Sequence, residues 1–104
     1  MQLDKNAIIA REKPTQYLLI LLPKDDKSKY LEKGGYNLNN WQQLEKDLKE
    51  QILTLNAYPT KKTNYGQKYE IVGILNCLNG KQLEIKTIWI VRESLTQFVA
   101  LFPA

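Results

Sequence analysis

The spacing of apolar residues changes near residue 57, and this change most limits what the chain can fold into. Before it, apolar residues recur every three or four positions, which is the period of an amphipathic helix. After it they alternate, which is the period of a strand with one buried face. The sequence therefore predicts an α+β fold in which N-terminal helices (residues 1–56) pack on a C-terminal antiparallel meander of three to four strands (residues 57–104). A chain of 104 residues is long enough for one core, so we expect a single domain over residues 1–104.

The first half of the chain opens with two short predicted helices. The first begins at Pro14, a residue type favoured in the first helical turn, and is stopped by Pro23. The second spans about residues 27–33 and ends at Gly34, since glycine commonly follows the last helical residue. An aspartate in the charged stretch 24–27 is its expected N-cap.

The third predicted helix has the most regular pattern in the chain. Asn39 is its expected N-cap, with Gln42 three residues later as in a capping box. Its apolar stripe consists of Trp41, Leu44, Leu48, Ile52 and Leu55. The opposite face mixes both signs of charge, as a solvated helix face does. The predicted contact between this helix and the sheet consists of Leu44, Leu48, Ile52, Ile85 and Trp89.

The second half of the chain reads as strands joined by short turns. The predicted strands cover residues 67–75, 82–92 and 98–102, with a fourth edge strand near Tyr58. A polar stretch, residues 60–66, is expected to be a loop. Asn79 and Gly80 form the strongest short-range hairpin signal, and we expect both in a tight primed turn at positive φ.

The absence of histidine and the single cysteine exclude several kinds of site. Without histidine the chain has no Ser-His-Asp triad, no Cys-His pair and no His-rich metal site. One cysteine, Cys77, cannot form an internal disulfide or a Cys-rich zinc site. We therefore expect no metal and no cofactor. Gly66 and Gly73 are assigned to backbone geometry, because no phosphate-binding glycine motif surrounds them.

Charge and hydropathy indicate the kind of partner and the compartment. The net charge is +4, and residues 57–104 alone carry six basic and three acidic residues. This excess suits an acidic partner such as nucleic acid or an acidic protein. The longest apolar run, residues 17–22, is far shorter than the roughly 20 residues that span a bilayer. No signal peptide is visible, so a cytoplasmic protein without membrane contact is expected.

Several short motifs are shared with a known group of proteins. They are Tyr17-Leu18-Leu19, Trp41-Gln42-Gln43-Leu44, Tyr65-Gly66-Gln67-Lys68-Tyr69, Gly73, Asn79-Gly80-Lys81, Thr87-Ile88-Trp89-Ile90 and Phe102-Pro103. In these the chain resembles a family of small uncharacterised bacterial domains that occur alone, beside another short gene, and at the C-termini of large secreted toxins. Many relatives carry a threonine before the final aromatic-proline pair, whereas the segment Ala100-Leu101-Phe102-Pro103 has none.

The resemblance implies a function by analogy of fold and context. The gene context of this family, with helices followed by an antiparallel sheet, is similar to that of the ribonuclease toxins of the RelE-like and barnase-like group. A chain of that kind would be a metal-independent endoribonuclease of a toxin–antitoxin pair, with RNA as substrate and a small cognate antitoxin protein as partner. Without histidine, lysine, tyrosine, arginine or glutamate would have to move the protons and stabilise the phosphorane charge.

The candidate site residues follow from this hypothesis and from strand parity. Lys68, Lys86 and Arg92 occupy even positions on two neighbouring predicted strands, so they are expected on one side of the sheet. The predicted catalytic residues are Lys68, Lys86, Arg92 and Tyr65, and the predicted RNA-binding residues are Lys61, Lys62 and Tyr69. Tyr65 and Tyr69 flank Lys68, where a tyrosine can stack on a base or donate a proton.

Two alternatives remain open. Lys68 and Lys86 can instead form cross-strand ion pairs with Glu70 and Glu84 on a solvated sheet face. Lys61 and Lys62 would then belong to an ordinary polar connection. In that case the chain is a non-enzymatic protein-binding module, or the partner subunit of a two-gene pair, whose sheet or edge strand docks another protein.

Overall fold

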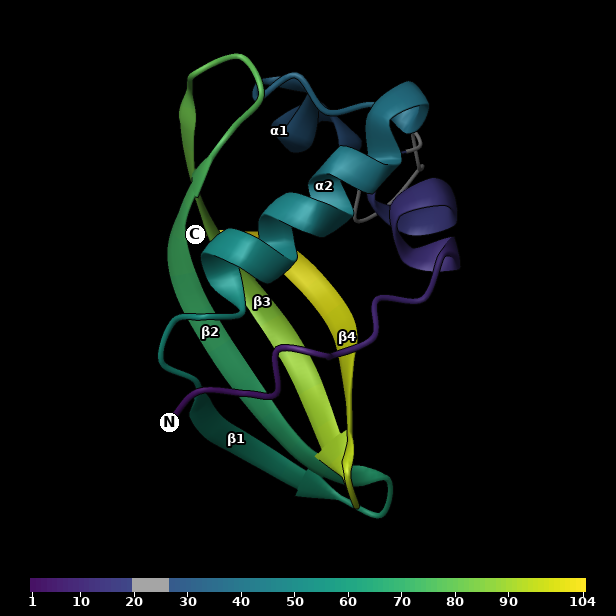
Figure 1. Cartoon of the computed structure of the whole chain (residues 1–104), viewed down its shortest axis with the longest axis vertical. Helices are drawn as coiled ribbons and strands as arrows, with labels where there is room; N and C mark the ends of the chain where they lie inside the picture. Colours follow the sequence, from purple (N-terminus) through teal and green to yellow (C-terminus); the bar gives the residue numbers. More distant parts are fainter. Residues whose placement is uncertain (20–26) are drawn as a thin grey trace.

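Four antiparallel strands and a set of short helices make up the computed structural model, which describes residues 1–19 and 27–104. The strands are β1 (Tyr58–Thr63), β2 (Gly66–Asn76), β3 (Gln82–Arg92) and β4 (Leu95–Pro103). They lie side by side in the order β1-β2-β3-β4, a meander in which each strand pairs with the next (Figure 1). The predicted α+β class and the predicted edge strand near Tyr58 are both confirmed.

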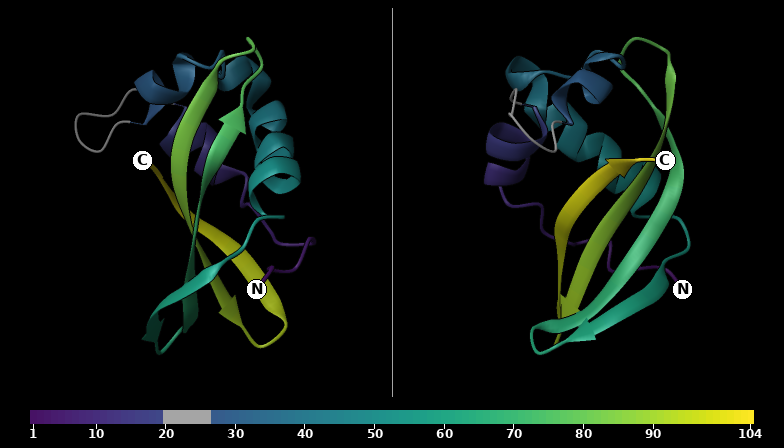
Figure 2. Two further views of the ribbon diagram at one scale, coloured as in Figure 1. Left: turned by 90° about the vertical axis from the view of Figure 1, so that its left-hand side faces the viewer. Right: turned by 180° about the vertical axis from the view of Figure 1, so that it is seen from behind.

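The helices are short, and all of them lie on one face of the sheet (Figures 1 and 2). They are η1 (Pro14–Leu18), α1 (Ser28–Glu32), η2 (Leu38–Asn40), α2 (Trp41–Asp47) and η3 (Leu48–Ile52). η1 and η3 are single π-helical turns, and η3 continues α2 without a break. The predicted end of the first helix at Pro23 and the aspartates of 24–26 lie outside the described residues. The sheet face away from the helices is called the outer face below, and Figure 2 shows no described segment over it.

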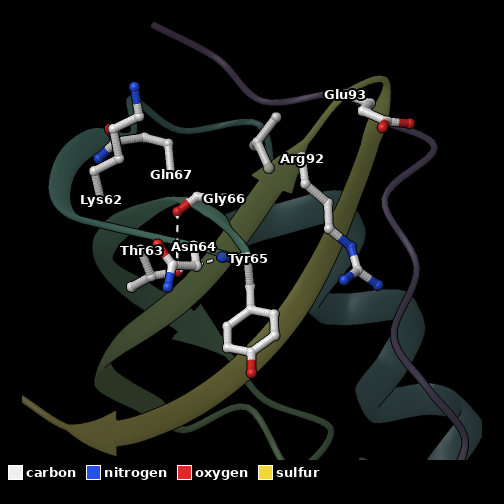
Figure 3. Close-up of a pocket in the computed structure, with 9 residues that line it drawn as sticks. Lys62, Thr63, Asn64, Tyr65, Gly66, Gln67, Arg92 and Glu93 are labelled. Carbon is white, nitrogen blue, oxygen red and sulfur yellow. Dashed lines mark hydrogen bonds between the residues drawn. The ribbon is translucent and has the colours of Figure 1, made fainter.

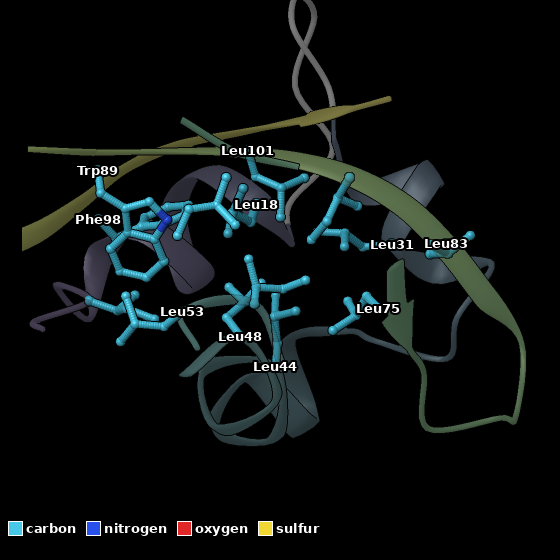
Figure 4. Close-up of a cluster of buried hydrophobic side chains, with 14 of the residues drawn as sticks. Leu18, Leu31, Leu44, Leu48, Leu53, Leu75, Leu83, Trp89, Phe98 and Leu101 are labelled. Atoms are coloured by element: carbon cyan, nitrogen blue, oxygen red, sulfur yellow. The ribbon is translucent and has the colours of Figure 1, made fainter. Parts of the chain in front are cut away.

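The core forms between α2–η3 and the sheet (Figure 4). The five residues predicted to meet there are all fully buried in one cluster: Leu44, Leu48, Ile52, Ile85 and Trp89. The indole Nε1 of Trp89 donates a hydrogen bond of 2.8 Å to Thr87 Oγ1, and its ring meets Phe98 edge-on at 5.3 Å. The predicted helix–sheet contact is confirmed.

The helix caps differ from the prediction. Asn37, not Asn39, begins the helical segment: its Oδ1 accepts from Asn39 N at 2.8 Å, and its own N–H donates to Asn40 Oδ1 at 2.9 Å. The cap moves two residues earlier because the 3₁₀ turn η2 precedes α2. The N-cap of α1 is Lys27, which makes no side-chain cap bond, and the aspartates predicted to cap this helix lie outside the described residues.

The β2–β3 hairpin is confirmed, but its turn is not the predicted one. The last strand pair is Asn76–Gln82, which leaves a five-residue connection. Within it Gly80 has φ +84, whereas Asn79 does not have a positive φ. Instead, Asn79 Nδ2 donates a hydrogen bond of 2.8 Å to Lys33 O. Asn79 therefore anchors the turn to the end of α1 and needs no left-handed backbone.

The polar stretch predicted to be a loop is largely strand. Residues 60–63 belong to β1, and only Asn64 and Tyr65 form the turn to β2. A register shift between Pro59 and Lys62 interrupts the pairing of β1 with β2. β1 is an edge strand with five exposed residues, so no apolar alternation marks it in the sequence.

At the opposite edge, the N-terminal segment pairs with β4. The Ile8 N–H donates to Thr96 O at 2.8 Å, and the Phe98 N–H donates to Ile8 O at 2.9 Å. In Figure 1 this segment crosses the sheet on the same side as the helices. It extends the covered face beyond the helices, and no described segment covers the outer face.

A buried polar cluster fixes the loop before α2. Tyr36 Oη donates to Asp47 Oδ2 at 2.5 Å, and Gln43 Nε2 donates to Asp47 Oδ1 at 2.8 Å. Burial raises the pKa of the Tyr36 hydroxyl well above its ordinary value, and the hydrogen bond to Asp47 raises it further. Burial also raises the pKa of the Cys77 thiol.

These raised pKa values predict that the protein loses stability in alkali. A tyrosine whose pKa is higher in the folded state than in the unfolded state contributes its full stabilisation below the unfolded pKa of about 10. Above that pH the free energy of unfolding should fall by about 1.4 kcal/mol per pH unit. Urea unfolding between pH 9 and 11, taken in steps of roughly half a unit, should show a shallower decline in Tyr36→Phe. Tyr65→Phe, which alters an exposed tyrosine, should keep the wild-type slope; equal slopes in all three proteins would refute the assignment.

Candidate functional site

The candidate site is a hollow at one end of the sheet, where the β1–β2 turn meets the β3–β4 turn (Figure 3). It is an open hollow of about 510 Å³, lined by residues of both turns and of the adjoining strand ends. Three of the seven predicted site residues line it: Lys62, Tyr65 and Arg92. Tyr65 and Arg92, 27 positions apart in the sequence, are thus brought to the same hollow by the pairing of β2 with β3.

The side chains in the hollow have distinct directions. Figure 3 shows Tyr65 and Arg92 extending to the same side, whereas Lys62 points the other way. Tyr65 is 73% exposed, so its ring is free to meet a ligand. Its backbone is held in the turn, because Tyr65 N donates to Thr63 Oγ1 at 3.1 Å and this hydroxyl donates to Gly66 O at 3.2 Å.

Gly66 allows the turn to lie directly against the end of β3. Its φ is +141°, and a Cβ at this position would stand 2.5 Å from Val91 O. A side chain here would therefore collide with backbone as well as strain φ. The assignment of Gly66 to backbone geometry agrees with this contact.

Gly66→Ala is expected to destabilise the protein by at least about 2 kcal/mol, since it adds a clash to a strained φ. Gly80 is the matched control: its φ is +84°, but no atom lies within 4 Å of an added Cβ. Gly80→Ala should cost only about 1 kcal/mol. Urea denaturation of the two variants measures the difference, and equal losses would show that the contact with Val91 is unimportant.

Lys68 and Lys86 lie on the outer face with Arg92, as strand parity predicted, but only Lys68 is near the hollow. Lys68 pairs with Ile90 and is therefore a diagonal neighbour of Arg92, at about 7–8 Å. Lys86 pairs with Val72, four residues along β2 from Lys68, or about 13 Å. The four predicted catalytic residues thus do not converge on one point.

Tyr69 and Lys61 do not join the hollow. Tyr69 is on the face opposite to Lys68 and is packed against the core, so it cannot stack on a base beside Lys68. Lys61 is exposed in β1 at the register shift and does not line the hollow. Among the predicted RNA-binding residues, only Lys62 lines it.

The alternative of cross-strand ion pairs is wrong for the strands as they pair. Each charged residue stands opposite an aliphatic one: Lys68–Ile90, Glu70–Ile88, Val72–Lys86 and Ile74–Glu84. Over residues 1–19 and 27–104, the ion pairs are Lys46–Glu50 and Lys49–Glu45, both 3.9 Å and both on α2–η3. Lys68, Lys86 and Arg92 therefore form no ion pair with a carboxylate within the described chain.

Glu93 is a lining residue that the sequence did not reveal. It occupies the β3–β4 turn with φ +54°, the one positive φ among the described non-glycine residues. Backbone strain of this kind at a non-glycine residue is often found at functional sites. In Figure 3 its carboxylate points away from Tyr65. A glutamate between an arginine and a serine belongs to no site motif that would have singled it out.

Comparison with known proteins places the chain in a family. Residues 2–104 match the model of a family described as a domain of unknown function, DUF6883. The chain belongs to this family. The expected resemblance to a small uncharacterised domain is confirmed over nearly the whole sequence. No curated protein and no solved structure matches the chain.

The described residues of this DUF6883 domain also bear on metal binding, membrane insertion and cysteine chemistry. In the described part of the chain, no group of three histidine, cysteine, aspartate or glutamate side chains is placed to hold a metal ion. No helix there is both long and apolar enough to cross a membrane. Cys77 is buried and its Sγ lies 3.4 Å from Leu75 O, and the raised pKa keeps it a thiol.

Proposed function

We propose that the hollow binds a phosphate group of single-stranded RNA and that the chain cleaves RNA there without a metal ion. The observation that carries the proposal is an exposed tyrosine in the same hollow as an arginine that forms no ion pair with a described carboxylate. A guanidinium group binds phosphate through two parallel hydrogen bonds. A tyrosine ring beside it can stack on an unpaired base.

In the proposed reaction the ribose 2′-oxygen attacks the neighbouring phosphorus. Its proton passes to a base, the 2′,3′-cyclic phosphate forms, and the 5′-oxygen leaves with a proton. Arg92 would stabilise the charge on the phosphorane oxygens, assisted by Lys68 on the diagonal position. Glu93 is the carboxylate among the lining residues and is assigned the base, after a change of rotamer; the Tyr65 hydroxyl is assigned the acid.

The test is incubation of the purified protein with a single-stranded RNA in the presence of EDTA. We expect products that end in 2′,3′-cyclic phosphate, and no cleavage of a DNA of the same sequence, because DNA lacks the 2′-hydroxyl. Tyr65→Phe should retain the ring and lose the acid. RNA that stays intact with the wild-type protein would overturn the proposal.

A protein-binding module is the second candidate function. The specific observation in its favour is the number of aliphatic side chains on the outer face, which sheet surfaces in contact with water usually avoid. It predicts no turnover of RNA by the wild-type protein.

A further inference from the structure

The outer face of the sheet carries an aliphatic stripe at its centre. An antiparallel sheet with one solvated face normally alternates apolar inward and polar outward residues. Here Val72 and Ile74 of β2 point outward and are 48% and 52% exposed, and Ile88 and Ile90 of β3 are half-buried beside them. We call these four residues the outer stripe. Figure 2 shows no described segment lying over this face.

The pairing of β2 with β3 gives the outer stripe its direction. Ile90 and Ile88 stand opposite Lys68 and Glu70, and Val72 and Ile74 continue the line on the neighbouring strand. The stripe therefore crosses diagonally from β3 to β2 over six residues of strand, about 20 Å. A helix of about 13 residues has this length.

Cations outnumber carboxylates around the outer stripe. Phe102, which pairs with Lys86 on the outer face, has Lys86 Nζ 5.7 Å from its ring centroid. Lys68 and Arg92 border the stripe at its Ile90 end. Glu70 and Glu84 are the carboxylates on the same strands. No ion pair within the described residues joins any of these cations to a carboxylate.

We propose that the outer stripe is the docking surface for an amphipathic helix of a partner protein whose flanks are acidic. The stripe would bury the apolar side of the helix, and Lys68, Arg92 and Lys86 beside the stripe would meet its carboxylates. A second copy of the chain fits less well, because each copy carries a net charge of +4. RNA also fits less well, because the stripe offers isoleucine and valine where single strands need aromatic rings.

The probe is a synthetic peptide of about 13 residues with leucine at helical spacing (i, i+3, i+4, i+7) and glutamate on its flanks. A scrambled peptide of the same composition is its control. Titration of the isotope-labelled protein, followed by amide NMR shifts, should place the helical peptide on β2 and β3. The scrambled peptide should bind at least about tenfold more weakly.

Three variants test the surface itself. Ile74→Asp and Lys86→Glu should each weaken peptide binding by about tenfold or more. Leu78→Asp, which alters a residue of similar exposure (46%) in the β2–β3 turn, should bind as the wild type does. The amide spectrum of each variant reports whether it is folded. Equal binding by Ile74→Asp, or equal binding of the scrambled peptide, would overturn the proposal.

The competing occupants have their own readouts. Sedimentation should show a monomer at the concentrations used for NMR; a dimer that Ile74→Asp dissociates would assign the surface to a second copy instead. Single-stranded RNA should shift amides around the hollow and leave Ile74 unaffected; shifts centred on the stripe would assign it to RNA. None of these measurements depends on RNA cleavage, so this inference and the proposed ribonuclease activity can fail separately.

Discussion

Replacing Leu48 with alanine is expected to lower the free energy of unfolding by about 2–5 kcal/mol. Leu48 is fully buried at the junction of α2 and η3, between Leu44 and Ile52 in sequence and directly under the sheet (Figure 4). Alanine would remove three buried carbon atoms, and the packed neighbours can close only part of the cavity. Urea denaturation followed by tryptophan fluorescence measures the loss, since Trp89 belongs to the same core.

Leu38→Ala is the matched control for Leu48→Ala. Leu38 lies in η2, just before the same helix, but is 45% exposed. Its replacement should change stability by about half a kcal/mol at most. Similar losses in the two variants would mean that the helix is not seated on the sheet as the structure shows.

The periodicity of the sequence predicted most of the fold because burial on one face is a strong constraint. Leu44, Leu48 and Ile52 had to share a helix face, and Ile85 and Trp89 had to share a strand face. Two such faces in a chain of this length can only cover each other. That reasoning needed no knowledge of register or of turn geometry.

The turns and caps were less predictable because several local solutions compete within about 1 kcal/mol. Asn37 and Asn39 are equally good caps by type, and only the extra turn η2 decides between them. Asn79 was assigned a positive φ by its residue type, whereas its side chain instead contacts the end of α1. Lys61 was placed in a loop because an edge strand exposed on both faces looks like one.

The candidate site was predictable only as far as strand parity reaches. Parity correctly placed Lys68 and Arg92 on one face. It would also have excluded Tyr69, which shares odd parity with the buried Ile71. The separation of Lys86 from the hollow depends on register, which fixes its opposite residue as Val72. No pattern in the sequence predicts the register of β2 against β3 to within one residue.

The proposed ribonuclease activity makes Arg92→Ala the most informative variant. If the guanidinium group stabilises charge that develops only in the transition state, its loss should slow RNA cleavage by roughly 10²-fold or more. Stability should change by about half a kcal/mol at most, because Arg92 is exposed at the end of β3 and has no described ion-pair partner. Arg92→Lys should recover only part of the rate, since an ammonium group cannot bind a phosphate through two parallel bonds.

Two lysines serve as controls for the effect of charge alone. Lys86→Ala removes a cation from the same sheet face at a distance from the hollow, and Lys46→Ala removes one from the opposite side, on α2. Each lowers the net charge by one, as Arg92→Ala does, so any long-range effect of charge on RNA binding should be similar in all three. A rate loss confined to Arg92→Ala would therefore reflect its place in the hollow. If all three variants cut RNA as fast as the wild type, Arg92 has no part in the reaction.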